Sequence, residues 1–126
     1  MRVLVDTSAI IGRERRGVSL QEFDEWYVSA ITIGELSLGV SMTVDPDERA
    51  IRRHTLVKVE DACFVRDVDE TVARRFGEVV AATRRAGRRV TTTDALIAAT
   101  ALVDDIPIVT QDVDFLGFEG LDVILV

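Results

Sequence analysis

Four widely separated carboxylates have the clearest chemical potential in this sequence. Each follows a short apolar run or opens an apolar helical segment, and together they are Asp6, Glu35, Asp94 and Asp112. If the chain brought them into one pocket, their negative charges would repel one another and raise their pKa values, unless a cation were bound. All-oxygen ligands favour hard divalent ions such as Mg²⁺ or Mn²⁺ over zinc. An ion held there would lower the pKa of a bound water and supply a nucleophile for hydrolysis.

Three of these acids also have ordinary structural explanations. Asp6 precedes a predicted helix and is of a residue type that caps helices. Asp94 follows Thr91-Thr92-Thr93 at a helix start, where the helix dipole favours an acid. Asp112 lies in a segment in which turn chemistry explains an aspartate well. Position alone leaves the structural and the chemical interpretation open for each of them.

Glu35 is harder to explain structurally. In a helix it shares a largely apolar face with its neighbours three and four positions away, which are Ile31, Thr32, Leu38 and Gly39. A charge on such a face is rare unless it is paired or binds a metal. No basic residue lies between Arg16 and Arg49, so a partner would have to be a distant arginine. We therefore favour a functional role for Glu35.

The other residue types exclude several chemistries. His54 is the only histidine and lies on a predicted solvent-facing helix, so a two-histidine, metal-free nuclease mechanism is excluded. Cys63 is the only cysteine, which excludes an internal disulfide, and a buried, inert thiol is its expected state. With one residue of each type, a zinc site is also disfavoured.

Short apolar strands alternate with helices along the chain, which predicts an α/β fold with a parallel sheet. The predicted strands are Arg2–Val5, Val28–Thr32, Cys63–Val68, Pro107–Thr110 and Leu121–Val126. The predicted helices are one that follows Asp6, Leu20–Tyr27, Ile33–Met42, one from Asp45 to about Val59, Asp69–Arg85 and Asp94–Val103, and Asp112–Gly120 is a predicted loop. Ligands of such sheets bind at the carboxyl ends of the strands. Asp6 and Asp112 each follow a strand, so we expect them at the same sheet edge.

Length and charge set further limits. The chain has 126 residues and 48% hydrophobic residues, which predicts one globular domain, 1–126. No apolar run is long enough to span a membrane, and Asp6 comes too early for a signal peptide, so a cytoplasmic protein is expected. The net charge of −7 argues against a nucleic-acid binder. However, the basic residues are nearly all clustered arginines, for which a solvated helix face is the simpler interpretation and phosphate contact the alternative.

Four segments in order carry a resemblance to a known family. They are Val3-Leu4-Val5-Asp6-Thr7-Ser8-Ala9-Ile10-Ile11, Ser29-Ala30-Ile31-Thr32-Ile33-Gly34-Glu35-Leu36-Ser37-Leu38-Gly39-Val40, Thr93-Asp94-Ala95-Leu96-Ile97-Ala98-Ala99-Thr100-Ala101 and Val109-Thr110-Gln111-Asp112-Val113-Asp114-Phe115. They resemble the motifs of PIN-domain proteins, in particular the VapC toxins of bacterial toxin–antitoxin modules. Any one motif is weak, but the four together cover the whole chain.

The resemblance implies a fold, an activity and partners. The fold would be a PIN-like three-layer sandwich, with a central parallel sheet and helices on both faces. The activity would be that of a toxin, an endoribonuclease that uses Mg²⁺ or Mn²⁺ to hydrolyse RNA. The implied partners are a cognate VapB-type antitoxin and a second copy in a homodimer, with no membrane involved.

The resemblance also assigns residues. It implies that the four acids are the catalytic and metal-binding set, that Asp114 assists, and that Thr7, Ser8 and Thr110 supply supporting hydroxyls. The chain departs from the pattern at Thr92, where many relatives have a further acid, and this leaves open whether one metal or two are held.

Two alternatives remain. A phosphoacceptor receiver domain fits the length, acidity and α/β alternation, but it needs a lysine after a late strand, and the only lysine is Lys58. A non-catalytic PIN-like module that binds RNA or protein is the second. The retention of all four acids argues against it, because a binding module would tolerate their loss.

Overall fold

The computed structural model describes residues 1–16 and 23–126. The strands are β1 (Arg2–Val5), β2 (Glu25–Ser29), β3 (Phe64–Arg66), β4 (Ile108–Thr110) and β5 (Val123–Leu125). The helices are α1 (Thr7–Arg16), α2 (Ala30–Met42), α3 (Pro46–Ala62), α4 (Glu70–Arg85) and α5 (Thr92–Asp104), with a short 3-10 helix, η1 (Val113–Gly117).

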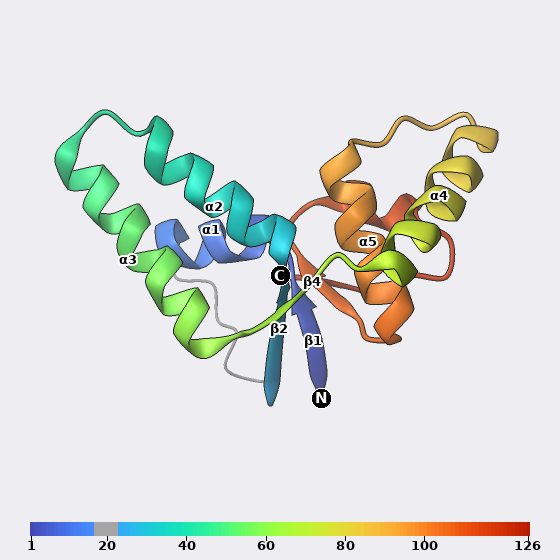
Figure 1. Cartoon of the computed structure of the whole chain (residues 1–126), viewed down its shortest axis with the longest axis horizontal. Helices are drawn as coiled ribbons and strands as arrows, with labels where there is room; N and C mark the ends of the chain where they lie inside the picture. The colour runs from blue at the N-terminus through green and yellow to red at the C-terminus, as the bar shows by residue number, and fades with distance from the viewer. Residues whose placement is uncertain (17–22) are drawn as a thin grey trace.

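The five strands form one parallel sheet in the order β3-β2-β1-β4-β5. Helices α1, α2 and α3 lie on one side of the sheet and α4 and α5 on the other (Figure 1). This arrangement confirms the predicted three-layer α/β sandwich. Because β1 lies between β2 and β4, the segments that follow these three strands meet at one edge of the sheet.

Alternate residues of the central strands face the two helical layers. Leu4 and Ile108 pack in the cluster under α4 and α5, whereas Val3, Val5 and Val109 pack in the cluster under α1–α3. All five side chains are at most 1% exposed. A sheet that is covered on both faces needs apolar residues at every position, which explains why these strands read as continuous apolar runs.

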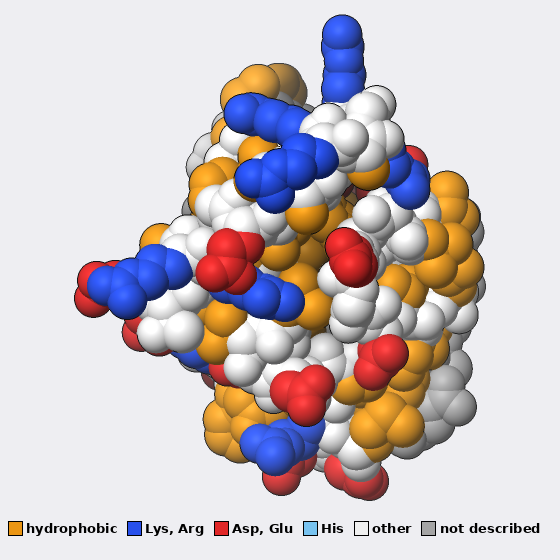
Figure 2. Space-filling model, turned by 90° about the vertical axis from the view of Figure 1, so that its right-hand side faces the viewer, with side chains coloured by type: hydrophobic (Ala, Val, Ile, Leu, Met, Phe, Trp, Pro, Cys, Tyr) orange, Lys and Arg blue, Asp and Glu red, His pale blue; other side chains and the backbone are white. Residues whose placement is uncertain are grey.

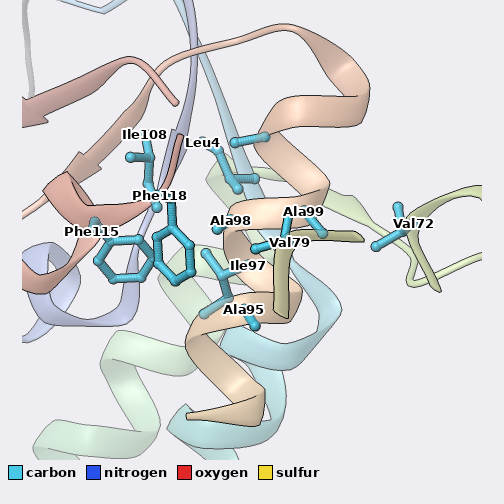
Figure 3. Close-up of a cluster of buried hydrophobic side chains, with 11 residues drawn as sticks. Leu4, Val72, Val79, Ala95, Ile97, Ala98, Ala99, Ile108, Phe115 and Phe118 are labelled. Carbon is cyan, nitrogen blue, oxygen red and sulfur yellow. The ribbon is translucent and has the colours of Figure 1, made fainter. Parts of the chain in front are cut away.

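Of the two α-helices on its side of the sheet, α5 is the more deeply buried. Its small side chains, Ala95, Ala98 and Ala99, are fully buried, so the helix can lie close to the sheet. Phe115 and Phe118 come from the η1 segment and pack beside α5, with ring centroids 5.6 Å apart (Figure 3). These rings fix η1, and with it the acids at its start, against α5.

The helix predicted at Leu20–Tyr27 is wrong within the described residues, and its first three residues lie outside them. Glu25–Ser29 form β2, whose register places Tyr27 opposite Leu4. The bulky aromatic and β-branched residues of this segment suit a half-buried strand better than a helix. Among the aromatic residues here, Phe23 is buried, whereas Trp26 and Tyr27 are partly exposed.

The second strand, predicted at Val28–Thr32, begins and ends three residues earlier, at Glu25–Ser29. Ser29 ends β2 and caps α2, since its Oγ accepts a hydrogen bond from the Ile31 amide at 3.0 Å. This cap outweighs the strand preference of Ile31 and Thr32. The predicted loop Asp112–Gly120 also differs, because it contains η1. The remaining predicted elements are present, and none of their predicted ends is shifted by more than three residues.

In the described part of the chain, no helix has both the length and the apolar character that a bilayer crossing requires.

Candidate metal centre

The sheet topology brings the predicted acids to one edge. Val5 pairs with Val109, and the Asp6 amide donates to the Val109 carbonyl at 2.8 Å, so the chain after β1 lies beside the chain after β4. Glu35 comes from the second turn of α2, which directly follows β2 on the other side of β1. Asp94 lies in the first turn of α5. Four separate elements thus contribute one acid each.

Asp6 is held by two hydroxyl groups. It is 4% exposed, and its Oδ2 accepts hydrogen bonds from Ser8 Oγ at 2.7 Å and from Thr110 Oγ1 at 2.9 Å. The two hydroxyl oxygens are also 3.0 Å apart, so one network joins the segments after β1 and β4. Among the described residues no buried polar side-chain atom lacks a hydrogen bond. Asp6 Oδ1 takes no part in this network, so it can serve as a ligand.

Glu35 is oriented in the same way from the neighbouring strand end. Thr7 Oγ1 donates to Glu35 Oε1 at 2.8 Å and lies 3.1 Å from Thr32 Oγ1. Within the described residues Glu35 forms no ion pair, so no distant arginine neutralises it there. The sequence reasoning did not single out Thr32 as part of this network. The available sequence signal was a hydroxyl side chain three positions before Glu35, on an otherwise apolar helix face. In the structure this hydroxyl side chain is fully buried.

Asp94 connects the four acids electrostatically. Thr91 caps α5, with its Oγ1 accepting from the Asp94 amide at 3.2 Å. Burial is the main cause that raises the pKa of Asp94, and the negative charges of Asp6, Asp112 and Glu35 raise it further, against a lowering by Thr91. The predicted acids are therefore near enough to Asp94 to disfavour its charge.

Asp112 and Asp114 belong to the turn that enters η1. Asp112 caps η1, because its Oδ1 accepts from the Asp114 amide at 2.9 Å. The Asp112 amide in turn donates to Thr110 Oγ1 at 3.0 Å. Asp112 therefore has the turn role expected from the sequence and also lies near Asp94. Asp114 is exposed, and so is Thr92 at the start of α5.

The acids do not form a closed metal cage. Among the described residues, no three His, Cys, Asp or Glu side chains are grouped tightly enough to hold one ion. The chemistry of the donors still fits a hard divalent cation, since all are oxygens and two carboxylates are pre-oriented by hydroxyls.

The remaining candidates lie elsewhere. His54 is exposed on α3 and lines a separate hollow between α1 and α3 together with Cys63. Burial raises the pKa of the partly buried Cys63 thiol to about 11, so the thiol stays protonated and unreactive near neutral pH. Neither residue contributes to the acidic edge, the edge of the sheet at which Asp6, Glu35, Asp94 and Asp112 lie.

The raised pKa of Asp94 predicts a pH dependence of stability. The folded, metal-free protein retains a proton on Asp94 where the unfolded chain, with the ordinary pKa of 3.8, has lost it. The free energy of unfolding should therefore fall as pH rises through this interval. We expect Asp94→Asn to lose this dependence and, in EDTA, to be at least as stable as the wild type at neutral pH. Thermal unfolding from about pH 4 to pH 8 measures both, and a wild type that gained stability over the variant with rising pH would contradict the assignment.

Comparison with known proteins agrees with this architecture. The PIN domain family model matches residues 3–121. Ribonuclease VapC4 of Mycobacterium tuberculosis is 37% identical over 127 residues, covering 99% of this chain and 97% of that protein. Ribonuclease VapC5 of the same organism is 35% identical, covering 93% and 87%.

Solved structures give the same result. A crystal structure of VapBC-5, a member of the VapBC family of toxin–antitoxin systems from Mycobacterium tuberculosis, superposes with a TM-score of 0.86 at 32% identity and covers 99% of this chain and 98% of that one. VapBC2 of Rickettsia felis also gives a TM-score of 0.86, covering 99% and 98%, but at 18% identity it shows a shared fold alone. The chain is therefore a PIN-domain protein of the VapC family.

Proposed function

We propose that the chain is the toxin of a type II toxin–antitoxin module and acts as an endoribonuclease that depends on Mg²⁺ or Mn²⁺. Its relatives are named ribonucleases and cover nearly its whole length. The observation that carries the proposal is the meeting of the segments after β1, β2 and β4, which bear Asp6, Glu35 and Asp112, at the carboxyl edge of the sheet. The charges of these three acids also raise the pKa of Asp94. Acids arranged in this way, without basic partners among the described residues, suit the hydrolysis of a phosphodiester.

The residues have separate tasks in this mechanism. Asp6, Glu35, Asp94 and Asp112 would hold the ion, with Asp114 as a further candidate, and Thr92 leaves open whether a second ion would be bound. When bound, the ion supplies a water of lowered pKa and offsets the negative charge of the transition state. Ser8 and Thr110 fix the Asp6 carboxylate and Thr7 fixes that of Glu35. One carboxylate accepts the proton that the attacking water loses.

The rival functions have less support. A receiver domain has the strand order 2-1-3-4-5, whereas this sheet has the order β3-β2-β1-β4-β5. A non-catalytic PIN-like module does not explain why two acids are each oriented by hydroxyl groups while one of their oxygens stays outside the network. The nuclease proposal accounts for both features.

The proposal extends to partners and location. Similar solved proteins are toxin–antitoxin complexes, which supports a cognate VapB-type antitoxin for this chain. We further propose a homodimer of single-domain chains, 1–126, that acts in the cytoplasm, where its RNA substrate is found. A basic segment of the antitoxin would be attracted to a protein with a net charge of −7.

Induced expression in a bacterial host tests the toxin proposal. Wild-type protein should arrest growth, and the purified protein should cleave total RNA with Mn²⁺ or Mg²⁺ but not with excess EDTA. Glu35→Gln should remove both effects, because it takes a charge from the proposed metal site. Glu60→Gln makes the same change at an exposed position on α3 and should behave as the wild type. Equal toxicity of Glu35→Gln and wild type, or full cleavage in EDTA, would contradict the proposal.

A further inference from the structure

A hollow of about 450 Å³ extends from the acidic edge toward the turn between α4 and α5. Its lining combines two acids, Asp94 and Asp114, with two bases, Arg88 and Arg89. Val90 and Phe118 add apolar surface. A polymeric ligand with a negative charge on every unit could thus contact the proposed metal at one end of the hollow and arginine at the other.

The guanidinium group of Arg88 lies directly over Gly117, the last residue of η1. A Cβ atom at position 117 would stand 2.3 Å from Arg88 Cζ, 2.5 Å from Nη2 and 2.6 Å from Nη1. Such distances are far inside van der Waals contact. The absence of a side chain at Gly117 therefore gives the guanidinium its position over the floor of η1, in the same hollow as Asp114.

In the part of the chain that the structure describes, Arg88 forms no ion pair with an acid. Among the described residues, Arg66, Arg74 and Arg75 form ion pairs with neighbouring carboxylates, whereas Arg88 and Arg89 form none. Both are exposed. Arg88 thus shares a hollow with two aspartates without pairing with either, and its planar fork remains available for an anion.

The distribution of charge around the hollow also favours the binding of an anion by Arg88. On the side of the molecule that carries α4 and α5, basic side chains gather at the upper end, where α4 ends and the chain turns toward α5 (Figure 2). The sequence places Arg84, Arg85, Arg88 and Arg89 in this segment. A protein with a net charge of −7 repels nucleic acid overall, so local basic groups beside the acidic edge would have to attract and orient the backbone.

We propose that Arg88, placed by Gly117, binds a backbone phosphate adjacent to the scissile one and so positions single-stranded RNA across the hollow. The inference rests on the proposed nuclease function, because the scissile phosphate is the one at the acidic edge. Arg88 acts on substrate binding and takes no part in proton transfer. It is a positioning residue, and Gly117 acts only through it.

Steady-state cleavage of a short, labelled, single-stranded RNA of randomised sequence separates binding from chemistry. Arg88→Gln should raise KM by about tenfold with kcat changed little. This is expected for the loss of one charge-assisted contact that is made equally in the ground state and the transition state. The slope of log KM against log salt should fall by about 0.7, the value for one phosphate contact on a single strand. Arg88→Lys should recover part of the loss.

Gly117→Ala supplies a matched test that keeps every charge. It should raise KM in the same direction by displacing the Arg88 guanidinium, and combining it with Arg88→Gln should add little further. Arg53→Gln removes an equal charge from an exposed position on α3, on the opposite side of the sheet from the hollow, and should change KM less than twofold. Thermal unfolding of each variant checks that the fold is intact. KM values for Arg88→Gln and Gly117→Ala equal to that of the Arg53→Gln control would overturn the inference.

Fluorescence anisotropy with the same RNA distinguishes the two proposals. If the wild type binds RNA through Arg88 but cleaves none, the phosphate site stands and the nuclease proposal fails. If the wild type cleaves and all variants bind equally, the nuclease stands and the inference about Arg88 fails. Loss of neutralisation by an antitoxin with RNA binding unchanged would assign Arg88 to a protein partner and likewise overturn it.

Discussion

Replacing Asp94 with asparagine is expected to lower kcat/KM for metal-dependent RNA cleavage by at least about 100-fold. Loss of a group that only supports a metal ligand costs 10- to 100-fold, and Asp94 is proposed as a ligand itself. The negative charges of Asp6, Asp112 and Glu35 contribute to its raised pKa, so Asp94 lies within the electrostatic field of the other three acids. Cleavage of total RNA in Mn²⁺, followed over time, measures the effect.

Asp105→Asn is the matched control for this prediction. It removes the same charge from the opposite end of the same helix, where Asp105 caps α5 in the left-handed region with φ 53°. Asparagine tolerates that conformation well, so the fold should be retained. Asp105→Asn should cleave at the wild-type rate. Equal activity of Asp94→Asn and Asp105→Asn would remove Asp94 from the mechanism.

Replacing Phe115 with alanine is expected to lower the free energy of unfolding by about 3–5 kcal/mol, the usual cost for a fully buried phenylalanine. Phe115 is 0% exposed and packs with Phe118 against α5 and the sheet (Figure 3). The cavity would also loosen η1, which Asp112 caps. Cleavage activity should therefore fall as well, even at temperatures where the variant stays folded.

Leu116→Ala provides the comparison within the same short helix. Leu116 is 58% exposed, so its truncation should cost less than about 1 kcal/mol, as surface substitutions usually do. Urea unfolding of both variants, with the activity of each measured in parallel, tests the contrast. Similar losses of stability for Phe115→Ala and Leu116→Ala would show that η1 is not held by the packing of Phe115.

The meeting of Asp6 and Asp112 at one edge of the sheet could be predicted from the sequence, because it depends on short local segments. Val3-Leu4-Val5 and Ile108-Val109 are short apolar runs that end at polar residues, and parallel strands place their carboxyl ends together. Asp6 and the segment of Asp112 are therefore side by side although 106 positions separate them in the sequence. Glu35 was identifiable because a carboxylate on an apolar helix face needs an explanation.

Other features depend on tertiary contacts that one sequence does not reveal. The segment Glu25–Ser29 becomes a strand because it pairs with both β1 and β3, whereas its aromatic spacing alone also suited a helix. The arginines after α4 have the sequence pattern of a solvated helix face. Only the closeness of Gly117, 29 positions away, distinguishes Arg88 from the arginines that pair along α4.

A crystal structure of the protein soaked with Mn²⁺, with anomalous diffraction recorded at the manganese edge, tests the central claim most directly. The account predicts an anomalous peak at the carboxyl edge of the sheet, within direct bonding distance of carboxylate oxygens from at least two of Asp6, Glu35, Asp94 and Asp112, and no such peak in crystals of Asp94→Asn. A fully soaked wild-type crystal without manganese at this edge, or with the ion bound only elsewhere, would contradict it.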